Sequence, residues 1–210
     1  MQQTTNTILM IRPINFRKNE QTAVNNYFQE DIDLQNAEIN KQAQEEFDAY
    51  VFKLRSYGVQ VVVISDTATS DTPDSIFPNN WISFHSEGVV GLYPMFAENR
   101  RLERRDDILN ELEKSGFLIE DIVDYTSAED EGFYLEGTGS IILDRVNKKA
   151  YCALSARADE DLFIEFCEDF EYTPVVFVAN QTVEGKREAI YHTNVMMCVA
   201  ETFAVICLDT

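Results

Sequence analysis

The sequence predicts an α/β fold made of repeated β-β-α-β units, arranged as a pseudo-symmetric α/β-propeller that is incomplete because its C-terminal unit is missing. The order strand, strand, helix, strand recurs in full over residues 81–123 and 139–178. Units that repeat at a period of about 50–60 residues are typical of arrays in which each unit buries one face on its neighbours. A further copy begins at Asn194 and reaches only its second strand, near Leu208. We therefore expect residues 1–210 to form a single propeller domain, truncated at its C-terminal end.

The first unit is predicted as a strand, a helix and a strand. Residues 7–11 are apolar, and residues 18–33 are polar, which is typical of a loop. Between residues 36 and 57 the apolar side chains recur at helical spacing, and Gly58 follows as an expected C-cap. Residues 59–64 form a continuous apolar run, which is typical of a buried strand.

The later units follow from turn and cap signals. Ser86-Glu87-Gly88 separates two apolar runs as in a hairpin, and Gly116 is expected to end a charged helix. The second unit is predicted as strands 81–85 and 89–93, helix 98–115 and strand 117–123. The third is predicted as strands 139–144 and 149–154, helix 159–169 and strand 174–178. The fourth begins with strands 194–199 and 203–208.

Charge argues against two classes of partner. The chain carries 37 acidic and 17 basic residues, a net charge of −20, and such a surface repels phosphate backbones and anionic lipid. Its N-terminus lacks the basic and apolar regions of a secretory signal. We expect a cytoplasmic protein that binds neither nucleic acid nor membrane, and the sequence leaves a homo-oligomer open.

The cysteines and histidines indicate neither disulfides nor metal. Cys152, Cys167, Cys198 and Cys207 form no Cys-x-x-Cys pair and lie in apolar or helical surroundings. We interpret them as buried free thiols in a reducing compartment. With two histidines and no ligand spacing, we expect no zinc site.

One stretch combines a lone carboxylate with unusual backbone freedom. Glu136 stands between an apolar approach, 133–135, and the turn Gly137-Thr-Gly-Ser140. Glycine permits positive φ and close approach of the backbone to a ligand. Loops on rigid scaffolds often carry function, so Glu136 is a candidate functional residue. The alternative is a tight turn with a solvated glutamate.

Three polar motifs occupy equivalent positions at the entrance of successive units, namely residues 76–83, 135–140 and 191–195. In a pseudo-symmetric array such loops converge on one axis, where amides, a carboxylate and an imidazole would form a polar pocket. Taken alone, Asn79 and Asn80 are also explained by turn chemistry. His192 alone is also explained as a hydrogen-bonded core histidine.

These motifs resemble the guanidino-group-modifying enzymes, the pentein or amidinotransferase-fold superfamily, and above all its arginine deiminase-related, citrulline-utilisation branch. The resemblance runs from Ile8 to the end of the chain. It implies a five-fold pseudo-symmetric α/β-propeller and a reaction that needs no metal or organic cofactor. The motifs that carry it are Phe77-Pro-Asn-Asn-Trp81, Leu135-Glu-Gly-Thr-Gly-Ser140, Leu154-Ser-Ala-Arg157 and Tyr191-His-Thr-Asn-Val-Met-Met-Cys198.

The resemblance also implies roles. Glu136 is similar to the glutamate that binds a substrate nitrogen and orients a histidine, and His192 to the general acid/base histidine. Asn80, next to Asn79, and Asn194 stand where deiminases carry aspartates that hold a guanidinium, so we expect all three asparagines to bind substrate. Arg157 resembles an arginine that binds the substrate carboxylate; the alternative for Arg157 is a surface salt bridge.

The nucleophile of the family is a cysteine near the C-terminus of a longer chain, and no residue here matches it. Cys198 and Cys207 are poor substitutes because we expect apolar strands to raise their thiol pKa. The chain is therefore expected to be either a fragment of an enzyme or a non-catalytic remnant.

The resemblance implies that the complete protein hydrolyses the ureido or guanidino carbon of a small amino acid. Citrulline is favoured over arginine because the asparagines are neutral. The alternatives are an amidinotransferase, an arginine deiminase, and a binding module without activity.

Overall fold

A computed structural model describes residues 2–30 and 33–210. The chain divides into two compact units. One consists of residues 5–78 and 97–120, and the other of residues 79–96 and 121–210 together with the first residues of the chain. Each unit is described below by itself.

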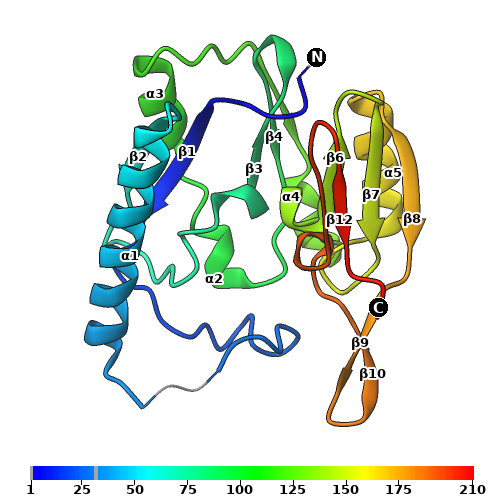
Figure 1. Cartoon of the computed structure of the whole chain (residues 1–210), viewed down its shortest axis with the longest axis horizontal. Helices are drawn as coiled ribbons and strands as arrows, with labels where there is room; N and C mark the ends of the chain where they lie inside the picture. Colours follow the sequence, from blue (N-terminus) through cyan, green and yellow to red (C-terminus); the bar gives the residue numbers. More distant parts are fainter. Residues whose placement is uncertain (1, 31–32) are drawn as a thin grey trace. The chain divides into compact units, whose positions relative to one another are not determined.

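The first unit is built on a parallel strand pair joined by a helix. Strands β1 (Thr7–Arg12) and β2 (Gln60–Ser65) pair in parallel from Thr7↔Gln60 to Arg12↔Ser65. Helix α1 (Asn36–Ser56) connects them and packs against them (Figure 1). Its buried Phe47 and Val51 contact a core that includes Val61. The C-cap is Tyr57, one residue earlier than predicted, and Gly58 follows it at φ +83°.

The predicted helix 98–115 is wrong, because the segment forms two helices, α2 (Glu98–Arg101) and α3 (Asp106–Lys114). Near the interruption, Arg100 Nε lies 2.9 Å from Glu103 Oε1 in a buried ion pair. Arg100 also donates to the carbonyl oxygens of Asp74 and Phe77. A buried guanidinium must satisfy its donors, and these partners hold Arg100 against the segment 74–77.

The polar segment 18–33 is a loop, as predicted, throughout its described residues; residues 31–32 of that prediction lie outside them. Its start is nevertheless buried. Asn19 is fully buried and donates to Asp74 Oδ2 at 2.8 Å, and it exchanges amide hydrogen bonds with Asn99. A polar composition thus hides an anchoring contact that a loop prediction does not reveal.

The second unit contains two three-stranded sheets of the same topology. Strands β3 (Ile82–Phe84) and β4 (Val89–Leu92) are antiparallel, and β5 (Asp121–Asp124) pairs in parallel with β4. Strands β6 (Ile141–Asp144) and β7 (Lys149–Ala153) are likewise antiparallel, and β8 (Thr173–Phe177) pairs in parallel with β7. Helix α5 (Glu160–Asp169) lies between β7 and β8 in sequence and covers the second sheet (Figure 1). The predicted β-β-α-β order is confirmed there.

Several predicted strand boundaries are wrong. The predicted strand 117–123 begins at Asp121 because its partner β4 begins at Val89. The predicted strand 139–144 begins at Ile141, since Gly137–Ser140 form the helical turn α4. Short 3₁₀ turns account for other residues: η1 (Pro78–Asn80), η2 (Ser86–Gly88), η3 (Thr126–Glu131) and η4 (Thr193–Val195).

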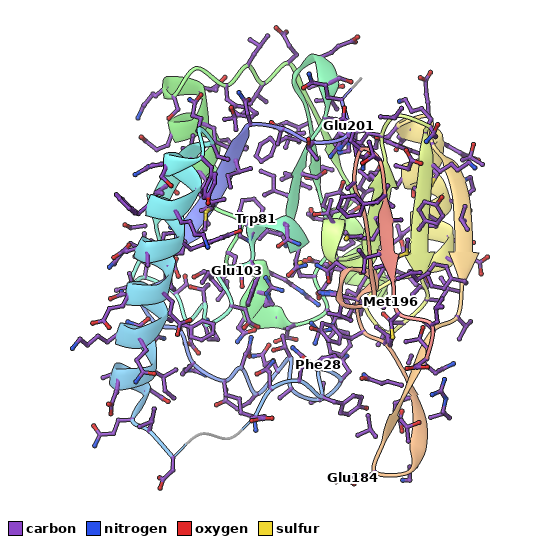
Figure 2. All side chains as sticks on the ribbon, viewed as in Figure 1. Phe28, Trp81, Glu103, Glu184, Met196 and Glu201 are labelled. Carbon is purple, nitrogen blue, oxygen red and sulfur yellow. The ribbon has the colours of Figure 1, made fainter. Side chains whose placement is uncertain are left out.

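Two hairpins follow β8. Strands β9 (Asn180–Val183) and β10 (Lys186–Ala189) were not predicted, because their polar sequences show no apolar alternation. Their turn places Glu184 and Gly185 at φ 49° and 81°, and Glu184 marks the tip in Figure 2. Strands β11 (Met197–Val199) and β12 (Ala204–Ile206) form the second hairpin, with Glu201 in its turn (Figure 2). Residues 194–196, predicted as strand, belong instead to η4 and the residue after it.

The cysteines divide into two pairs. Cys152 and Cys167 are buried free thiols in the core around α5, as predicted, and burial raises the pKa of each to about 12. For Cys198 and Cys207 the predicted burial is wrong, because both are exposed on or beside the β11–β12 hairpin.

Among the described residues, no helix is both long and apolar enough to cross a membrane.

His85 is packed into the second unit as a neutral side chain. Its ring stacks on Phe170 with the centroids 4.0 Å apart. Its Nε2 lies 2.6 Å from Ser83 Oγ, which lies 2.6 Å from the buried Tyr93 hydroxyl. Burial, together with the nearby positive charges of Arg145 and Lys148, lowers the pKa of His85 to about 3.

We expect this histidine to make the fold sensitive to acid. Because its folded-state pKa lies below the ordinary 6.5, His85 stabilises the fold above that pH, and this contribution is lost as the pH falls from 6.5 towards 3. The unfolding free energy of the wild type is expected to fall as the pH is lowered through this window. In His85→Gln this fall should be smaller, by up to about 1.4 kcal/mol per pH unit. Denaturant titrations of both proteins between about pH 7 and pH 4 measure the difference. Parallel pH profiles would contradict the prediction.

Candidate functional site

Glu136 is held by the backbone on both sides. Its N–H donates to the carbonyl of Arg157 at 3.0 Å, and its own carbonyl accepts the N–H groups of Gly139 and Ser140 in the turn α4. The side chain is fully buried, with an exposed fraction of 0%. The alternative of a solvated glutamate in a surface turn is therefore wrong.

The Glu136 carboxylate binds an imidazole, a guanidinium and a backbone amide. Oε2 lies 2.7 Å from His192 Nε2 and 3.4 Å from Arg157 Nη1, and Oε1 accepts the backbone N–H of Phe96 at 3.1 Å. A buried carboxylate is costly to desolvate unless charges and donors compensate it. Arg157 supplies the charge, and the histidine and the amide supply donors.

Arg157 is a buried cation beside this carboxylate, with an exposed fraction of 2%. Its guanidinium carbon lies 4.9 Å from the ring centroid of Tyr191 and 5.9 Å from that of Phe96. Aromatic faces attract a guanidinium at these distances. The alternative of a surface salt bridge is therefore wrong for Arg157.

Asn80 reaches the same place from the loop before β3. Asn80 is buried. Its closeness to His192 follows from the atoms that surround Gly139. A Cβ added to Gly139 would overlap Asn80 Nδ2 and would come within 2.9 Å of Cε1 and Nδ1 of His192. The three polar loops thus meet, and we call Asn80, Glu136, Arg157 and His192 the Glu136 cluster.

Two of the six candidate residues lie at the edge of this cluster. Asn79 is half-buried, and its carbonyl accepts the Thr138 hydroxyl at 3.2 Å. Asn194 is exposed on η4, two residues after His192. Among the interactions described for residues 2–30 and 33–210, none joins the Asn194 side chain to Glu136 or His192.

The geometry assigns the two nitrogens of His192 to different surroundings. Nε2 lies 2.7 Å from the carboxylate of Glu136, and an ionised carboxylate accepts only, so in that state Nε2 carries the proton of this contact. Nδ1 lies on the side of Gly139, where a Cβ added to the glycine would come within 2.9 Å of it. An imidazole oriented by a carboxylate at one nitrogen can exchange a proton at the other, which is the arrangement that general acid–base catalysis uses.

Sequence reasoning missed Phe96 and Tyr191, which flank the Arg157 guanidinium. It also missed the hydroxyl side chains Ser140, Ser155 and Thr193, which bind backbone groups of the segments that carry the cluster. Each hydroxyl lies within four residues of a cluster member. That proximity was the available signal.

The sequence matches a family model described as N,N dimethylarginine dimethylhydrolase, eukaryotic, over residues 12–210. The chain belongs to this family. Its place in the pentein superfamily of guanidino-modifying enzymes, expected from the motifs, is thereby confirmed. A comparison of this dimethylarginine dimethylhydrolase-family chain with curated proteins found no match.

Solved structures share its α/β fold. The N-terminal domain of ArgZ, a cyanobacterial arginine dihydrolase, bound to substrate, is 16% identical with a TM-score of 0.60; the match covers 91% of this chain and 62% of that one. Dimethylarginine dimethylaminohydrolase from Pseudomonas aeruginosa, complexed with citrulline, is 16% identical with a TM-score of 0.60, covering 92% and 65%. AgrE, in a complex with ornithine and NAD+, is 15% identical with a TM-score of 0.63, covering 95% and 26%. The chain thus spans less than two thirds of the length of each of these three.

Proposed function

We propose that this chain belongs to a hydrolase that acts on the ureido or guanidino carbon of a small amino acid through a covalent cysteine intermediate. The observation that carries the proposal is the buried contact of 2.7 Å between Glu136 Oε2 and His192 Nε2, with Arg157 and Asn80 beside it. Membership of a family that is described by hydrolysis of dimethylarginine supports the same class of reaction.

In this proposal a thiolate attacks the planar carbon, and His192 protonates the departing nitrogen. The same imidazole then removes a proton from the water that hydrolyses the covalent intermediate. Glu136 keeps the ring oriented and stabilises its protonated form. Glu136 also binds a substrate nitrogen, and Arg157 holds the substrate carboxylate.

The nucleophile is proposed to lie outside these 210 residues. Cys152 and Cys167 belong to the core around α5, where burial raises the pKa of each thiol to about 12. A thiol with such a pKa is a poor nucleophile at neutral pH. Cys198 and Cys207 are exposed on or beside the β11–β12 hairpin and do not belong to the Glu136 cluster. The chain alone is therefore expected to bind substrate without turnover. Sequencing the gene past codon 210 and assaying its full product tests this proposal, and a full product without a further cysteine would contradict it.

We further propose that both units belong to one pseudo-symmetric α/β-propeller domain of which this chain is a truncated part. The β3-β4-β5 and β6-β7-β8 sheets repeat one topology, an antiparallel pair followed by a parallel one. The parallel β1–β2 pair matches the second part of this topology, and the antiparallel β11–β12 pair matches the first part. On β12, Val205 and Ile206 are exposed, as expected for a strand that takes up a further partner.

The preferred substrate is proposed to be citrulline, which would be hydrolysed with one water to ornithine, ammonia and carbon dioxide. A guanidinium carries a full charge, whereas a ureido group is neutral and offers one carbonyl acceptor with N–H donors. Within the Glu136 cluster the one carboxylate already faces Arg157 at 3.4 Å. Asn80 adds a neutral amide that can both donate to the ureido carbonyl and accept from its N–H.

We expect the full-length enzyme to prefer citrulline to arginine by roughly ten-fold to several hundred-fold in kcat/KM, since unpaired polar groups cost about 1–3 kcal/mol each. Changing Asn80→Asp with Asn194→Asp should shift this ratio towards arginine, because carboxylates attract the guanidinium. The matched control is Asn110→Asp, which makes the same change at an exposed asparagine on α3, outside the Glu136 cluster. A wild-type preference for arginine, or an unchanged ratio in the double variant, would show that the amides do not select the substrate.

Two other reactions and one inactive state make different predictions. An arginine deiminase would release citrulline from arginine and stop there. An amidinotransferase would form product only when an amine acceptor is added. A binding module without activity would bind the amino acid in the full-length product without turnover. Product analysis with each substrate, with and without an added amine, separates the four.

The proposed hydrolase acts on a small-molecule amino acid in the cytoplasm. Four cysteines without a disulfide among the described residues support a reducing compartment. The surplus of 20 negative charges argues against nucleic acid and anionic membrane as partners.

A further inference from the structure

The Glu136 cluster is carried by three segments that lie far apart in the sequence. They are residues 136–140, 153–157 and 191–193, which contain the acid, the cation and the base. Each contributes one serine or threonine hydroxyl that binds a backbone group of another segment. These hydroxyls belong to Ser140, Ser155 and Thr193.

The three hydrogen bonds form a closed cycle. Ser140 Oγ donates to the carbonyl oxygen of Arg157 at 2.8 Å, and Ser155 Oγ donates to the carbonyl oxygen of Tyr191 at 2.9 Å. Thr193 Oγ1 then donates to the carbonyl oxygen of Ser140 at 2.5 Å. The first segment thus binds the second, the second binds the third, and the third binds the first.

Two of the hydroxyls, those of Ser155 and Thr193, also accept hydrogen bonds. Ser155 Oγ accepts the backbone N–H of Arg157 at 3.1 Å, and Thr193 Oγ1 accepts that of Ala153 at 2.8 Å. Ser140 and Thr193 are fully buried. A buried hydroxyl that both donates and accepts fixes its surroundings, because losing it leaves buried partners unsatisfied.

These contacts differ from ordinary helix caps and turns. They join residues 17, 36 and 53 positions apart, whereas caps and turns join residues two to four apart, roughly one turn. They therefore hold tertiary geometry. They surround the 2.7 Å contact between His192 and Glu136. Ser155 binds the carbonyl of Tyr191, next to His192, and Thr193 binds the carbonyl of Ser140, at the end of the Glu136 turn. Ser140 binds the carbonyl of Arg157, which also accepts the N–H of Glu136.

We propose that Ser140, Ser155 and Thr193 form a positioning ring that sets the Glu136–His192 hydrogen bond. They are positioning residues, because the functional groups act and the hydroxyls only place them. The effect of the ring on turnover rests on the proposed function. The effect of the ring on the Glu136–His192 hydrogen bond does not rest on it, so the ring and the proposed function can be disproved separately.

The test uses the 210-residue chain, which has two histidines, His85 and His192, so their ring N–H signals can be assigned by NMR. Thr193→Val keeps the shape of the side chain and removes the hydroxyl. We expect solvent exchange of the His192 ring N–H to accelerate about ten-fold or more, because the contact with Glu136 opens more often. Thr193→Ser should restore slow exchange. Ser155→Ala, at a half-buried site, should act in the same direction if Thr193→Val does not fold.

Ser83→Ala is the matched control. It also removes a buried hydroxyl, which binds His85 and Tyr93 outside the ring. It should lower the unfolding free energy without changing exchange at His192. Equal acceleration in Ser83→Ala, or unchanged exchange in both Thr193→Val and Ser155→Ala, would overturn the ring. In Ser140→Ala with Thr193→Val the second change should add little, since one break opens the cycle, and full additivity would also count against it.

Discussion

Replacing His192 with alanine in the full-length enzyme is expected to lower kcat by about 10²- to 10⁴-fold, because proton transfer to the leaving nitrogen and from the attacking water both use its imidazole. His192 is buried and contacts Glu136 through Nε2 at 2.7 Å, and its Nδ1 lies close to Gly139. Removing the imidazole leaves a buried carboxylate short of one partner, so the change also lowers stability, and folding has to be measured beside turnover. Steady-state kinetics and thermal unfolding of the same preparation measure both effects.

The control for this change is the other histidine. His85 binds Ser83 and stacks on Phe170, in the core rather than in the Glu136 cluster. His85→Gln should therefore change stability in acid and leave kcat at neutral pH within about two-fold. If His192→Ala keeps wild-type turnover, the imidazole has no part in the reaction and His192 is a core histidine.

The sequence was sufficient to predict those features that depend on local pattern. The strand pairs β3–β4 and β6–β7 follow from apolar runs separated by turn residues, and α1 and α5 from helical spacing. The convergence of the loops that carry Asn80, Glu136 and His192 followed from their equivalent places in the repeats. Periodicity fixes such features because it reports which face of an element is buried.

Features that depend on buried polar contacts could not be predicted. Arg100 looks like one cation in a charged helix, yet it is buried with Glu103 near the point where the helix is interrupted. Arg157 was singled out through its motif, but only the structure shows that it is buried against Glu136. Cys198 fails in the opposite direction, since its apolar neighbours predicted burial and its side chain is exposed. In each case tertiary partners decide the environment.

Gly139→Ala is expected to reduce kcat of the full-length enzyme by about 10²-fold while the protein stays folded. The added methyl would overlap Asn80 Nδ2 and come within 2.9 Å of two atoms of the His192 ring. Both neighbours are side chains that can yield, so the cost in stability should be about 1–3 kcal/mol. The ring cannot yield without losing its contact with Glu136, and a misplacement of about 1 Å is enough for a loss of this size.

Two further variants separate a displaced site from backbone strain. Gly185→Ala introduces a methyl at φ +81° where nothing lies within 4 Å, so it should cost stability through backbone strain alone and leave kcat unchanged. Asn80→Ala combined with Gly139→Ala makes room for the methyl, and the double variant should regain the His192 ring N–H signal that the single variant loses. Because Asn80 itself is proposed to bind substrate, NMR rather than turnover is the measurement here. If Gly139→Ala leaves both kcat and the ring signal at wild-type values, His192 does not lie against Gly139 in the working enzyme, and the Glu136 cluster is not its active site.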